Sequence, residues 1–370
     1  MTLKTIAITG VNGFIGRNLA VRLGELGFDI APLSRESDES QWLDAISRAD
    51  AIAHLAGANR PEDPSDFLAI NVGISQRLGG MLRDLERSVP IVYASTTKAE
   101  EATEYGRSKL LAEQSLQEVA KELGSDLYIY RLPNVFGKWA RPNYNSAIAT
   151  FCHNVVRDLP ITIQDPQASL TLVYVDDLVA EIVATLTDRP PSGYREVAPV
   201  YHATVGEIAN IIIEFREDRD NGFIANVGTG LTRALYATYV SALPVDQFSY
   251  ELVSHTDPRG SFSEMLKTRE AGQFSYFTAH PGVTRGGHYH HTKTEKFLIV
   301  HGSARFRFRH IITDATHEIL TSGKQPVVVE TIPGWSHDVT NVGDDILVAV
   351  LWANELFDRE KPDTVAEKVF

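Results

Sequence analysis

Four side chains in the C-terminal third of the chain have the types and spacing of metal ligands. His288 and His290 are two residues apart, which on a β-strand places both side chains on one face. Glu295 follows after four residues, and His337 lies further along the chain. Imidazole nitrogens and carboxylate oxygens bind divalent transition metals. The spacing therefore predicts a site with three or four ligands for a divalent cation.

Three glycines close to the N-terminus, Gly10, Gly13 and Gly16, are spaced at intervals of three residues. They follow a predicted strand and open a predicted helix. Glycines at such a position permit a tight turn and a close approach of the backbone to a pyrophosphate, which then lies at the helix N-terminus. The pattern predicts a dinucleotide-binding site. An ordinary strand–turn–helix corner is the alternative, and the flanking elements favour the first interpretation.

The end of the second predicted strand indicates which dinucleotide binds. A site that prefers NAD usually has Asp or Glu at this strand end, where the carboxylate binds the ribose 2'-hydroxyl. Here the strand ends in Leu33-Ser34-Arg35, and Ser34 and Arg35 are able to hold a 2'-phosphate instead. We therefore expect NADPH as the cofactor. The alternative is that Arg35 is a solvated loop residue.

Tyr105 and Lys109 are four residues apart, which places a phenol and an ammonium group one turn apart on a helix. A tyrosine pKa of about 10 is too high for acid–base chemistry at neutral pH, and a neighbouring cation lowers it toward the working range. Upstream, Ser95 and Thr96 follow a predicted strand and supply hydroxyls able to polarise a carbonyl. Capping of the strand end is the alternative role for these hydroxyls.

Two kinds of fold must position these residues. Before residue 180, short β-branched runs alternate with amphipathic stretches, which favours parallel βαβ units in a doubly wound sheet. From Phe248 onward, short alternating strands separated by turn residues are typical of an antiparallel sandwich or barrel. The predicted domains are residues 1–243 and 244–370, with mostly helix over 181–243. The clearest early elements are strands at Thr5–Thr9, Asp29–Leu33, Ala51–Leu55, Ile91–Ser95 and Leu127–Leu132, and helices at Phe14–Leu26 and Ser108–Leu123.

The bulk composition limits the classes of function. A chain of 370 residues exceeds the usual size of a single core, so two domains are expected. The formal net charge of -13 argues against nucleic acid or an anionic membrane as a partner. Cys152 is the only cysteine, and no apolar run approaches the ~20 residues of a membrane span. We expect a cytoplasmic protein without a signal peptide.

Several motifs in the first 240 residues occur together in the order of one enzyme family. They are GVNGFIG from Gly10, HLAG from His54, Asn71-Val72, Ser95-Thr96, Tyr105-x-x-x-Lys109, RLPNVFG from Arg131 and VYVDD from Val173. This set resembles the extended short-chain dehydrogenases/reductases that act on nucleotide sugars, which have a Rossmann-type fold.

The resemblance implies a role for each matching residue. Tyr105 would exchange a proton with the C4 oxygen of a sugar, Lys109 would bind the nicotinamide ribose, and Thr96, or else Ser95, would hydrogen-bond the sugar. Arg131 and Asn134 would contact the substrate. The implied cofactor-binding residues are Gly10, Asn12, Gly13, Phe14, Ile15, Gly16, Ser34, Arg35, His54, Ala56, Tyr105 and Lys109.

The spacing of the metal ligands resembles the paired motifs of the cupin superfamily, which has an all-β jelly-roll fold. The second motif is looser than usual, because Pro333 and Gly334 are adjacent where one residue often intervenes. The resemblance implies a bound metal, for which we expect zinc. The alternative is a cupin that has lost its metal. The implied ligands are His288, His290, Glu295 and His337.

A further resemblance overlaps with the metal site. The segments DPRGSFSE from Asp257 and VTRGGH from Val283 are similar to the dTDP-4-keto-6-deoxyhexose 3,5-epimerases. This implies that Arg259 and Arg285 hold a substrate diphosphate and that His288 is the base that removes a proton next to a ketone. Those epimerases need no metal, so His288 has two competing roles here.

The pairing of the two domains resembles the bifunctional capsular polysaccharide synthesis enzymes of the CapF type. This implies C3 epimerisation of a UDP-2-acetamido-2,6-dideoxy-4-hexulose, then NADPH-dependent C4 reduction to the L-talose sugar. Epimerisation must come first, because the C3 hydrogen is acidic only beside a ketone. A homodimer is expected from the cupin resemblance. The alternative is an NAD-dependent epimerase or dehydratase whose cupin only senses sugar or oligomerises.

Overall fold

A parallel sheet of largely buried strands lies at the centre of the N-terminal part of the chain. The computed structural model describes residues 3–59, 61, 63, 66–358 and 360–370. Six strands pair in parallel in the order β2-β1-β3-β4-β5-β8, which confirms the predicted doubly wound sheet. Their bounds are β1 (Thr5–Thr9), β2 (Asp29–Leu33), β3 (Ala51–His54), β4 (Ile91–Thr96), β5 (Leu127–Leu132) and β8 (Gly193–Arg195).

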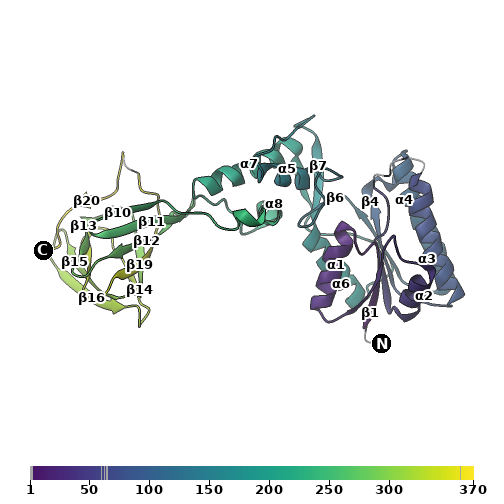
Figure 1. Ribbon diagram of the computed structural model, residues 1–370, viewed down its shortest axis with the longest axis horizontal. Helices are drawn as coiled ribbons and strands as arrows, with labels where there is room; N and C mark the ends of the chain where they lie inside the picture. Colours follow the sequence, from purple (N-terminus) through teal and green to yellow (C-terminus); the bar gives the residue numbers. More distant parts are fainter. Residues whose placement is uncertain (1–2, 60, 62, 64–65, 359) are drawn as a thin grey trace. The chain divides into compact units, whose positions relative to one another are not determined.

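Helices cover both faces of this sheet (Figure 1). Helices α1 and α6 lie on one face, and α2, α3 and α4 lie on the other. Local signals fix two of these helices: a capping box of Asp38 and Gln41 begins α2, and Thr103 caps α4, which ends at Gly124 with a φ of 66°. The helices are α1 (Phe14–Glu25), α2 (Glu39–Arg48), α3 (Gly73–Asp84), α4 (Glu104–Leu123) and α6 (Val175–Asp188).

A smaller three-stranded sheet and further helices complete this part of the chain. Most of residues 181–243 is helical, as predicted, although the short strands β8 and β9 also lie there. The small sheet has β7 between β6 and β9. Its strands are β6 (Asn134–Phe136), β7 (Ser169–Tyr174) and β9 (Tyr201–Thr204), and the helices are α5 (Ala147–Val155), α7 (Val205–Asp220) and α8 (Gly230–Ser241). Short helical turns lie at Leu68–Val72, Thr97–Glu100 and Val245–Gln247.

The chain divides into two compact units, which we describe separately. The N-terminal unit comprises residues 1–213 and 233–243, and the C-terminal unit comprises residues 214–232 and 244–370. The chain therefore passes from one unit to the other three times: within α7, within α8 and at Leu243–Pro244. The grouping of 214–232 with the C-terminal unit was not expected from the sequence.

Two antiparallel sheets form the C-terminal unit, as expected for a cupin-like β domain. Their strand orders are β10-β11-β12-β19-β14-β17 and β16-β15-β18-β13-β20. The first sheet contains β10 (Ser254–Asp257), β11 (Gly260–Lys267), β12 (Gln273–Ala279), β14 (Glu295–His301), β17 (Val328–Glu330) and β19 (Leu347–Ala353). The second contains β13 (Thr284–Tyr289), β15 (Ser303–His310), β16 (Thr316–Ser322), β18 (Trp335–Asn341) and β20 (Val365–Ala366).

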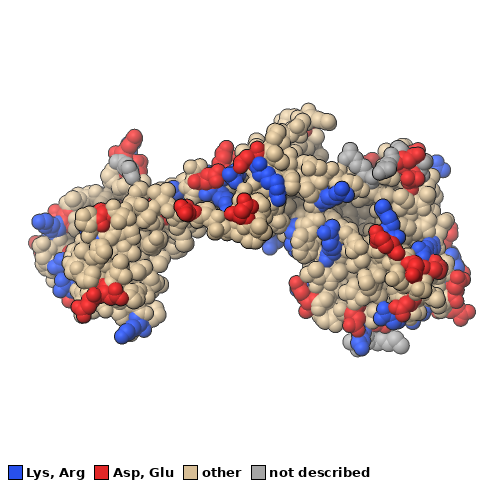
Figure 2. Space-filling view, viewed as in Figure 1, with Lys and Arg blue, Asp and Glu red and all other residues tan. Residues whose placement is uncertain are grey.

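The inner faces of these two sheets form one apolar core. Strand β15 alternates buried and half-buried residues, so that Phe306 and Phe308 point inward. The core also contains Phe277, Phe297 and Leu351 from the other sheet. Acidic and basic side chains are interspersed over the face of the N-terminal unit seen in Figure 2. Within the described ranges, no helix is long and apolar enough to cross a membrane.

Candidate active sites

The glycine turn of the N-terminal unit is closed so tightly that side chains would not fit. Gly10 has a φ of 69°, and a Cβ atom there would lie 2.8 Å from the Cα atom of Ala56. A Cβ atom on Gly16 would lie 2.2 Å from the carbonyl oxygen of Gly10. Gly13 is the N-cap of α1 and offers no side chain to the first N–H groups of the helix. These groups are therefore available to a phosphate, as the sequence predicts.

His54 lies behind this turn. Its ring is fully buried, with Nδ1 2.7 Å from the Thr9 hydroxyl and Nε2 3.0 Å from the Ser75 hydroxyl. Burial lowers the pKa of His54 to about 3, so the ring is neutral. The Thr9 hydroxyl also accepts hydrogen bonds from the backbone N–H groups of Leu55 and Ala56. His54 thus supports the strand end that contacts Gly10.

An acidic residue lies beside the predicted 2'-phosphate site. The Ser34 hydroxyl, just after β2, donates a hydrogen bond of 2.6 Å to the carboxylate of Glu36. The bond to Ser34 is the main cause that holds the pKa of Glu36 below its usual value. Sequence reasoning considered only the strand end and therefore missed Glu36. The preference for NADPH stays a prediction.

Tyr105 and Lys109 lie in the first turns of α4, with Thr96 at the end of β4 beside the tyrosine. The Tyr105 phenol donates a hydrogen bond of 3.1 Å to Asn59, and the Thr96 side chain lies close enough to influence the pKa of the phenol. Burial raises the pKa of Tyr105, and Thr96 opposes this rise. The Lys109 ammonium donates to the backbone oxygen of Ala94 at 2.6 Å. Burial lowers the pKa of Lys109 to about 7. The expected lowering of the tyrosine pKa by this lysine is not seen.

A buried carboxylate engages the other predicted hydroxyl. Ser95 donates a hydrogen bond to Glu113, which is fully buried one turn after Lys109. Arg131 binds the same carboxylate through Nε at 3.1 Å and Nη2 at 2.9 Å. Ser95 is therefore turned into the protein and Arg131, which is partly exposed, is bound to the same carboxylate, whereas Thr96 lies beside Tyr105. Sequence reasoning missed Glu113, although its position on the same face of α4 as Tyr105 and Lys109 was a usable signal.

An open, polar depression of about 670 Å³ lies beside Asn59, the residue that accepts the hydrogen bond of the Tyr105 phenol. Asn59 is one of its lining residues. The rest of the lining comes from the segment before and within the first turn of α5: Asn143, Tyr144, Asn145, Ser146, Ala147 and Thr150. Amide and hydroxyl groups of this kind are suited to the hydrogen-bonding groups of a sugar or nucleotide. Asn134 does not line this depression; its side chain donates to the backbone oxygen of Thr171.

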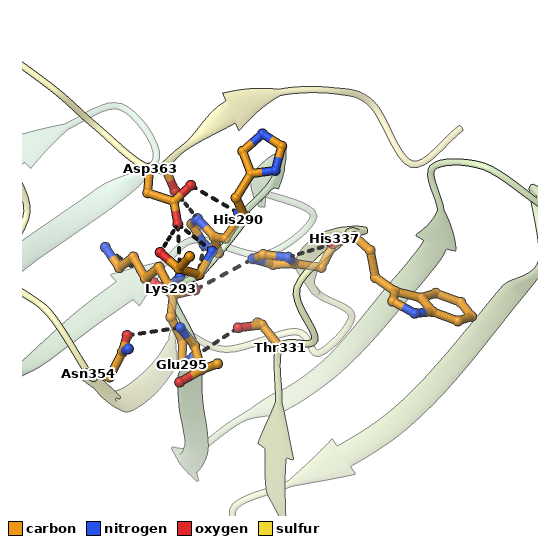
Figure 3. A network of polar contacts seen from close by, with 11 residues as sticks. His290, Lys293, Glu295, Thr331, His337, Asn354 and Asp363 are labelled. Atoms are coloured by element: carbon orange, nitrogen blue, oxygen red, sulfur yellow. Dashed lines mark hydrogen bonds and ion pairs between the residues drawn. The ribbon is translucent and has the colours of Figure 1, made fainter.

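The four predicted metal ligands meet in the C-terminal unit. One ligand atom from each of His288, His290, Glu295 and His337 lies within 4.8 Å of the others. The rings of His290 and His337 present Nε2 to one oxygen of Glu295, at 3.4 and 3.5 Å (Figure 3). Glu295 begins β14, where its backbone N–H donates to the Thr331 hydroxyl at 2.9 Å.

The donor set of this cluster fits a metal ion. The Nδ1 atom of His290 contacts the backbone oxygen of Asp363, and that of His337 contacts the backbone oxygen of Trp335. Because carbonyl oxygens only accept hydrogen bonds, Nδ1 must carry the proton, and a neutral ring then presents a lone pair at Nε2. Two lone pairs thus face a carboxylate. In the described structure, the buried Nε2 atom of His337 has no hydrogen-bond partner. A cation between these acceptors satisfies all of them.

Without a metal, protons take the place of the cation between these acceptors, and the pKa shifts of the cluster describe that state. Burial raises the pKa of Glu295, but His290 and His337 outweigh it and hold this pKa far below its usual value. Burial and the two neighbouring imidazoles lower the pKa of His288 to about 4. His288 is therefore neutral at pH 7. A neutral imidazole is able to bind a metal or to accept a proton.

A cavity of about 140 Å³ inside the barrel ends at this cluster. Phe277, Phe297 and Phe306 line it together with Arg285 and three of the four metal-site residues. The Nε atom of Arg285 donates to the backbone oxygen of Thr278, while its buried Nη2 has no partner among the residues described. Burial lowers the pKa of Arg285. Arg285 therefore offers a free donor to an oxygen-bearing ligand.

Arg259 lies near Arg285 but is engaged differently. Its guanidinium is exposed and binds the carboxylate of Asp257 through Nε at 3.0 Å and Nη2 at 2.5 Å. Sequence reasoning also missed Lys293, a buried lysine whose Nζ lies 3.9 Å from the second oxygen of Glu295. Lys293 lies within the HHTKTE segment, so its closeness to the ligands was a usable signal.

Comparisons with known proteins agree with this architecture. The model of the NAD dependent epimerase/dehydratase family matches residues 6–195, and that of the polysaccharide biosynthesis C-terminal domain matches residues 255–365. The chain is 53% identical, over 363 residues and 98% of each protein, to a UDP-2-acetamido-2,6-beta-L-arabino-hexul-4-ose reductase from Pseudomonas aeruginosa.

Solved structures show the same relationship. The capsular polysaccharide assembling protein CapF from Staphylococcus aureus matches with a TM-score of 0.93 and 41% identity, covering 98% of this chain and 100% of that one. A UDP-N-acetylglucosamine 4-epimerase from Bacillus cereus matches with a TM-score of 0.52 and 23% identity, covering 59% of this chain and 83% of that one, which shows a shared fold alone. The chain therefore belongs to the NAD dependent epimerase/dehydratase family and, with its C-terminal β domain, to the CapF type within it.

Proposed function

We propose that this chain converts a UDP-2-acetamido-2,6-dideoxy-4-hexulose into UDP-2-acetamido-2,6-dideoxy-L-talose, on a route to N-acetyl-L-fucosamine and surface polysaccharide. The C-terminal domain, residues 244–370, inverts C3, and the N-terminal domain, residues 1–243, reduces C4 with NADPH. The observation that carries the proposal is the group of Tyr105, Thr96 and Lys109 beside a polar depression. The 53% identical relative, which is named as a 4-ulose reductase, supports it.

In the reduction, Tyr105 donates the proton that the C4 oxygen needs. A bound nicotinamide cofactor supplies the hydride to C4. The Thr96 hydroxyl lies beside Tyr105 and hydrogen-bonds the C4 oxygen, which keeps the carbonyl within reach of the phenol. Lys109, one turn after Tyr105 on α4, binds the nicotinamide ribose. Asn59 positions the phenol.

In the epimerisation, a base removes the C3 proton beside the ketone, and a proton returns to the opposite face. The cluster would hold a divalent metal, for which we propose zinc, and such an ion would supply Lewis-acid stabilisation of negative charge on the C4 oxygen. His288 is the most exposed of the four cluster residues and is neutral, so it is our candidate for the base, with His290, Glu295 and His337 as ligands. Arg285 directs its free Nη2 to an oxygen of the substrate in the cavity.

The structure contains one observation that favours a cofactor other than NADPH. The carboxylate of Glu36 lies where an acid would bind a ribose 2'-hydroxyl, and this favours a second candidate that uses NAD. Titration of the purified chain with NADPH and with NADH, followed by fluorescence of the bound cofactor, separates the two. A homodimer in the cytoplasm stays a prediction from the sequence.

The proposal is tested by incubating the chain with the 4-keto sugar nucleotide and NADPH in D2O and recording the NMR spectrum of the product. Deuterium at C3 together with a C4 alcohol is the expected result. A C4 alcohol with hydrogen retained at C3 would leave only the reductase. If NADPH is not oxidised and the C3 hydrogen does not exchange, both halves of the proposal are rejected.

A further inference from the structure

The end of the chain returns to the strands that carry the metal ligands. Residues 363–370, which we call the C-terminal strap, include β20, which pairs antiparallel with β13 at His288 and Tyr289. The backbone N–H of Glu367 donates to Gly287 at 3.0 Å, and the Ser336 hydroxyl of β18 donates to the backbone oxygen of Glu367. The strap is therefore bound to both strands that bear histidine ligands.

Further contacts fix the strap to the barrel. Arg309 on β15 donates to the carboxylate of Glu367 and to the backbone oxygens of Lys368 and Val369. The Val369 side chain is 1% exposed. These contacts show that the strap is a packed part of the domain rather than a loose terminus.

Asp363 at the start of the strap organises the loop between β13 and β14. Its carboxylate accepts hydrogen bonds from the backbone N–H groups of His291 at 2.9 Å, Thr292 at 2.7 Å and Lys293 at 2.8 Å, and from the Thr292 hydroxyl at 3.0 Å. Burial opposes ionisation, but these donors hold the pKa of Asp363 well below its usual value. The carboxylate is thus a fixed centre around which the loop folds.

The same residue also orients a metal ligand. The backbone oxygen of Asp363 lies 2.5 Å from Nδ1 of His290, which assigns the proton to Nδ1 and directs the lone pair of Nε2 toward Glu295 (Figure 3). The loop that Asp363 folds also ends at Lys293, whose amine lies beside the second oxygen of Glu295. Asp363 therefore positions two neighbours of Glu295, the ring of His290 and the amine of Lys293.

We propose that Asp363 is a positioning residue for the metal site and that this site has its full affinity only when the C-terminal strap is docked. The inference rests on the proposed metal site. Groups that hydrogen-bond metal-ligating histidines typically change metal affinity about 10- to 100-fold when removed. Asp363 influences the metal site in two ways: its carboxylate holds the loop between β13 and β14, and its backbone oxygen orients the ring of His290. The apparent stability of the docked strap must in turn rise with metal binding.

The test measures metal affinity in the full-length chain. Wild type, Asp363→Ala and Asp363→Asn are stripped of metal and titrated with Zn²⁺ against a chromophoric chelator, and with Co²⁺ followed by its visible spectrum. Both variants keep the backbone oxygen that binds Nδ1 of His290, so they test the carboxylate and the loop that it holds. We expect affinity to fall about 10-fold in the alanine variant, at the low end of such effects, and less in the asparagine variant, whose amide oxygen still accepts hydrogen bonds. The control is Asp345→Ala, because Asp345 is exposed and binds His301 outside the cluster.

Each outcome decides the question. Weaker metal binding with an unchanged melting temperature of the metal-free chain supports the proposal, as does recovery of C3 exchange at excess Zn²⁺. Unchanged affinity in Asp363→Ala overturns it. An equal loss of melting temperature with and without metal in both Asp363 variants also overturns it, since the role would then be structural alone. Failure of wild type to bind Zn²⁺ or Co²⁺ would instead reject the metal site itself.

Discussion

At the scale of single residues, the two hydroxyls at the end of β4 have different surroundings. Ser95 is turned toward the buried carboxylate of Glu113, and Thr96 lies beside the Tyr105 phenol. The sequence offered both residues for one role and favoured Thr96. Side-chain direction decides between them, because successive residues of a strand point to opposite faces.

A matched pair of substitutions tests this difference. We expect Thr96→Val to lower kcat for C4 reduction about 100-fold, because it removes a hydroxyl from the reacting oxygen while keeping the volume. Ser95→Ala should instead lower the stability of the chain by about 1 kcal/mol. Steady-state oxidation of NADPH and thermal unfolding measure the two effects. A larger loss of kcat in Ser95→Ala than in Thr96→Val would reverse the assignment.

The titration of the metal cluster makes stability depend on pH. Without metal, the pKa of Glu295 is below its usual 4.5. Its contribution to the free energy of unfolding is therefore present above pH 4.5 and is lost as the pH falls below that value. The pKa of His290 is raised above 6.5: burial lowers it, but Glu295 and Asp363 outweigh burial. That contribution is present below pH 6.5 and is lost as the pH rises through the raised value.

His288 acts in the opposite sense, because its pKa is lowered to about 4 and its contribution to stability is lost as the pH falls from 6.5 toward 4. We therefore expect the metal-free C-terminal unit to be most stable near pH 6.5, and the metal-loaded unit to gain stability above pH 6.5 as its ligands lose protons. Thermal unfolding from pH 4 to 8, with EDTA and with excess Zn²⁺, measures both curves. Parallel curves under the two conditions would contradict the assignment of these residues as ligands.

At the scale of elements, the turn between β1 and α1 depends on its glycines to different degrees. A Cβ atom on Gly16 would meet the backbone oxygen of Gly10 at 2.2 Å. Gly24 lies later in the same helix, and none of the described atoms is within 4 Å of its Cβ position. These two positions share a helix, but Gly16 is buried in its first turn and Gly24 is exposed near its end.

We expect Gly16→Ala to lower the free energy of unfolding by about 1–3 kcal/mol and to weaken cofactor binding, because the turn must open to admit the methyl group. Gly24→Ala should raise it by about 0.5–1 kcal/mol through helix propensity. Chemical denaturation and cofactor titration check both. Normal cofactor binding by Gly16→Ala would show that the close approach is not needed for the site.

At the scale of the whole molecule, local patterns were enough to predict much of the architecture. The β1 and β5 bounds, the glycine turn and the meeting of His288, His290, Glu295 and His337 follow from periodicity and motif spacing. Contacts between distant segments were not predictable. Asp363 lies 73 residues after His290, and Glu113 meets Arg131 across two elements. No local spacing encodes such pairs.

In the proposed function, two separate sites of this chain act on one sugar. The most direct test incubates the Tyr105→Phe and His290→Ala variants with the 4-keto sugar nucleotide and NADPH in D2O. The NMR spectrum of each product then shows whether C3 carries deuterium and whether C4 is an alcohol. We expect Tyr105→Phe to place deuterium at C3 without forming the C4 alcohol, and His290→Ala to place no deuterium at C3. Loss of C3 exchange in Tyr105→Phe, or its retention in His290→Ala, would contradict the account.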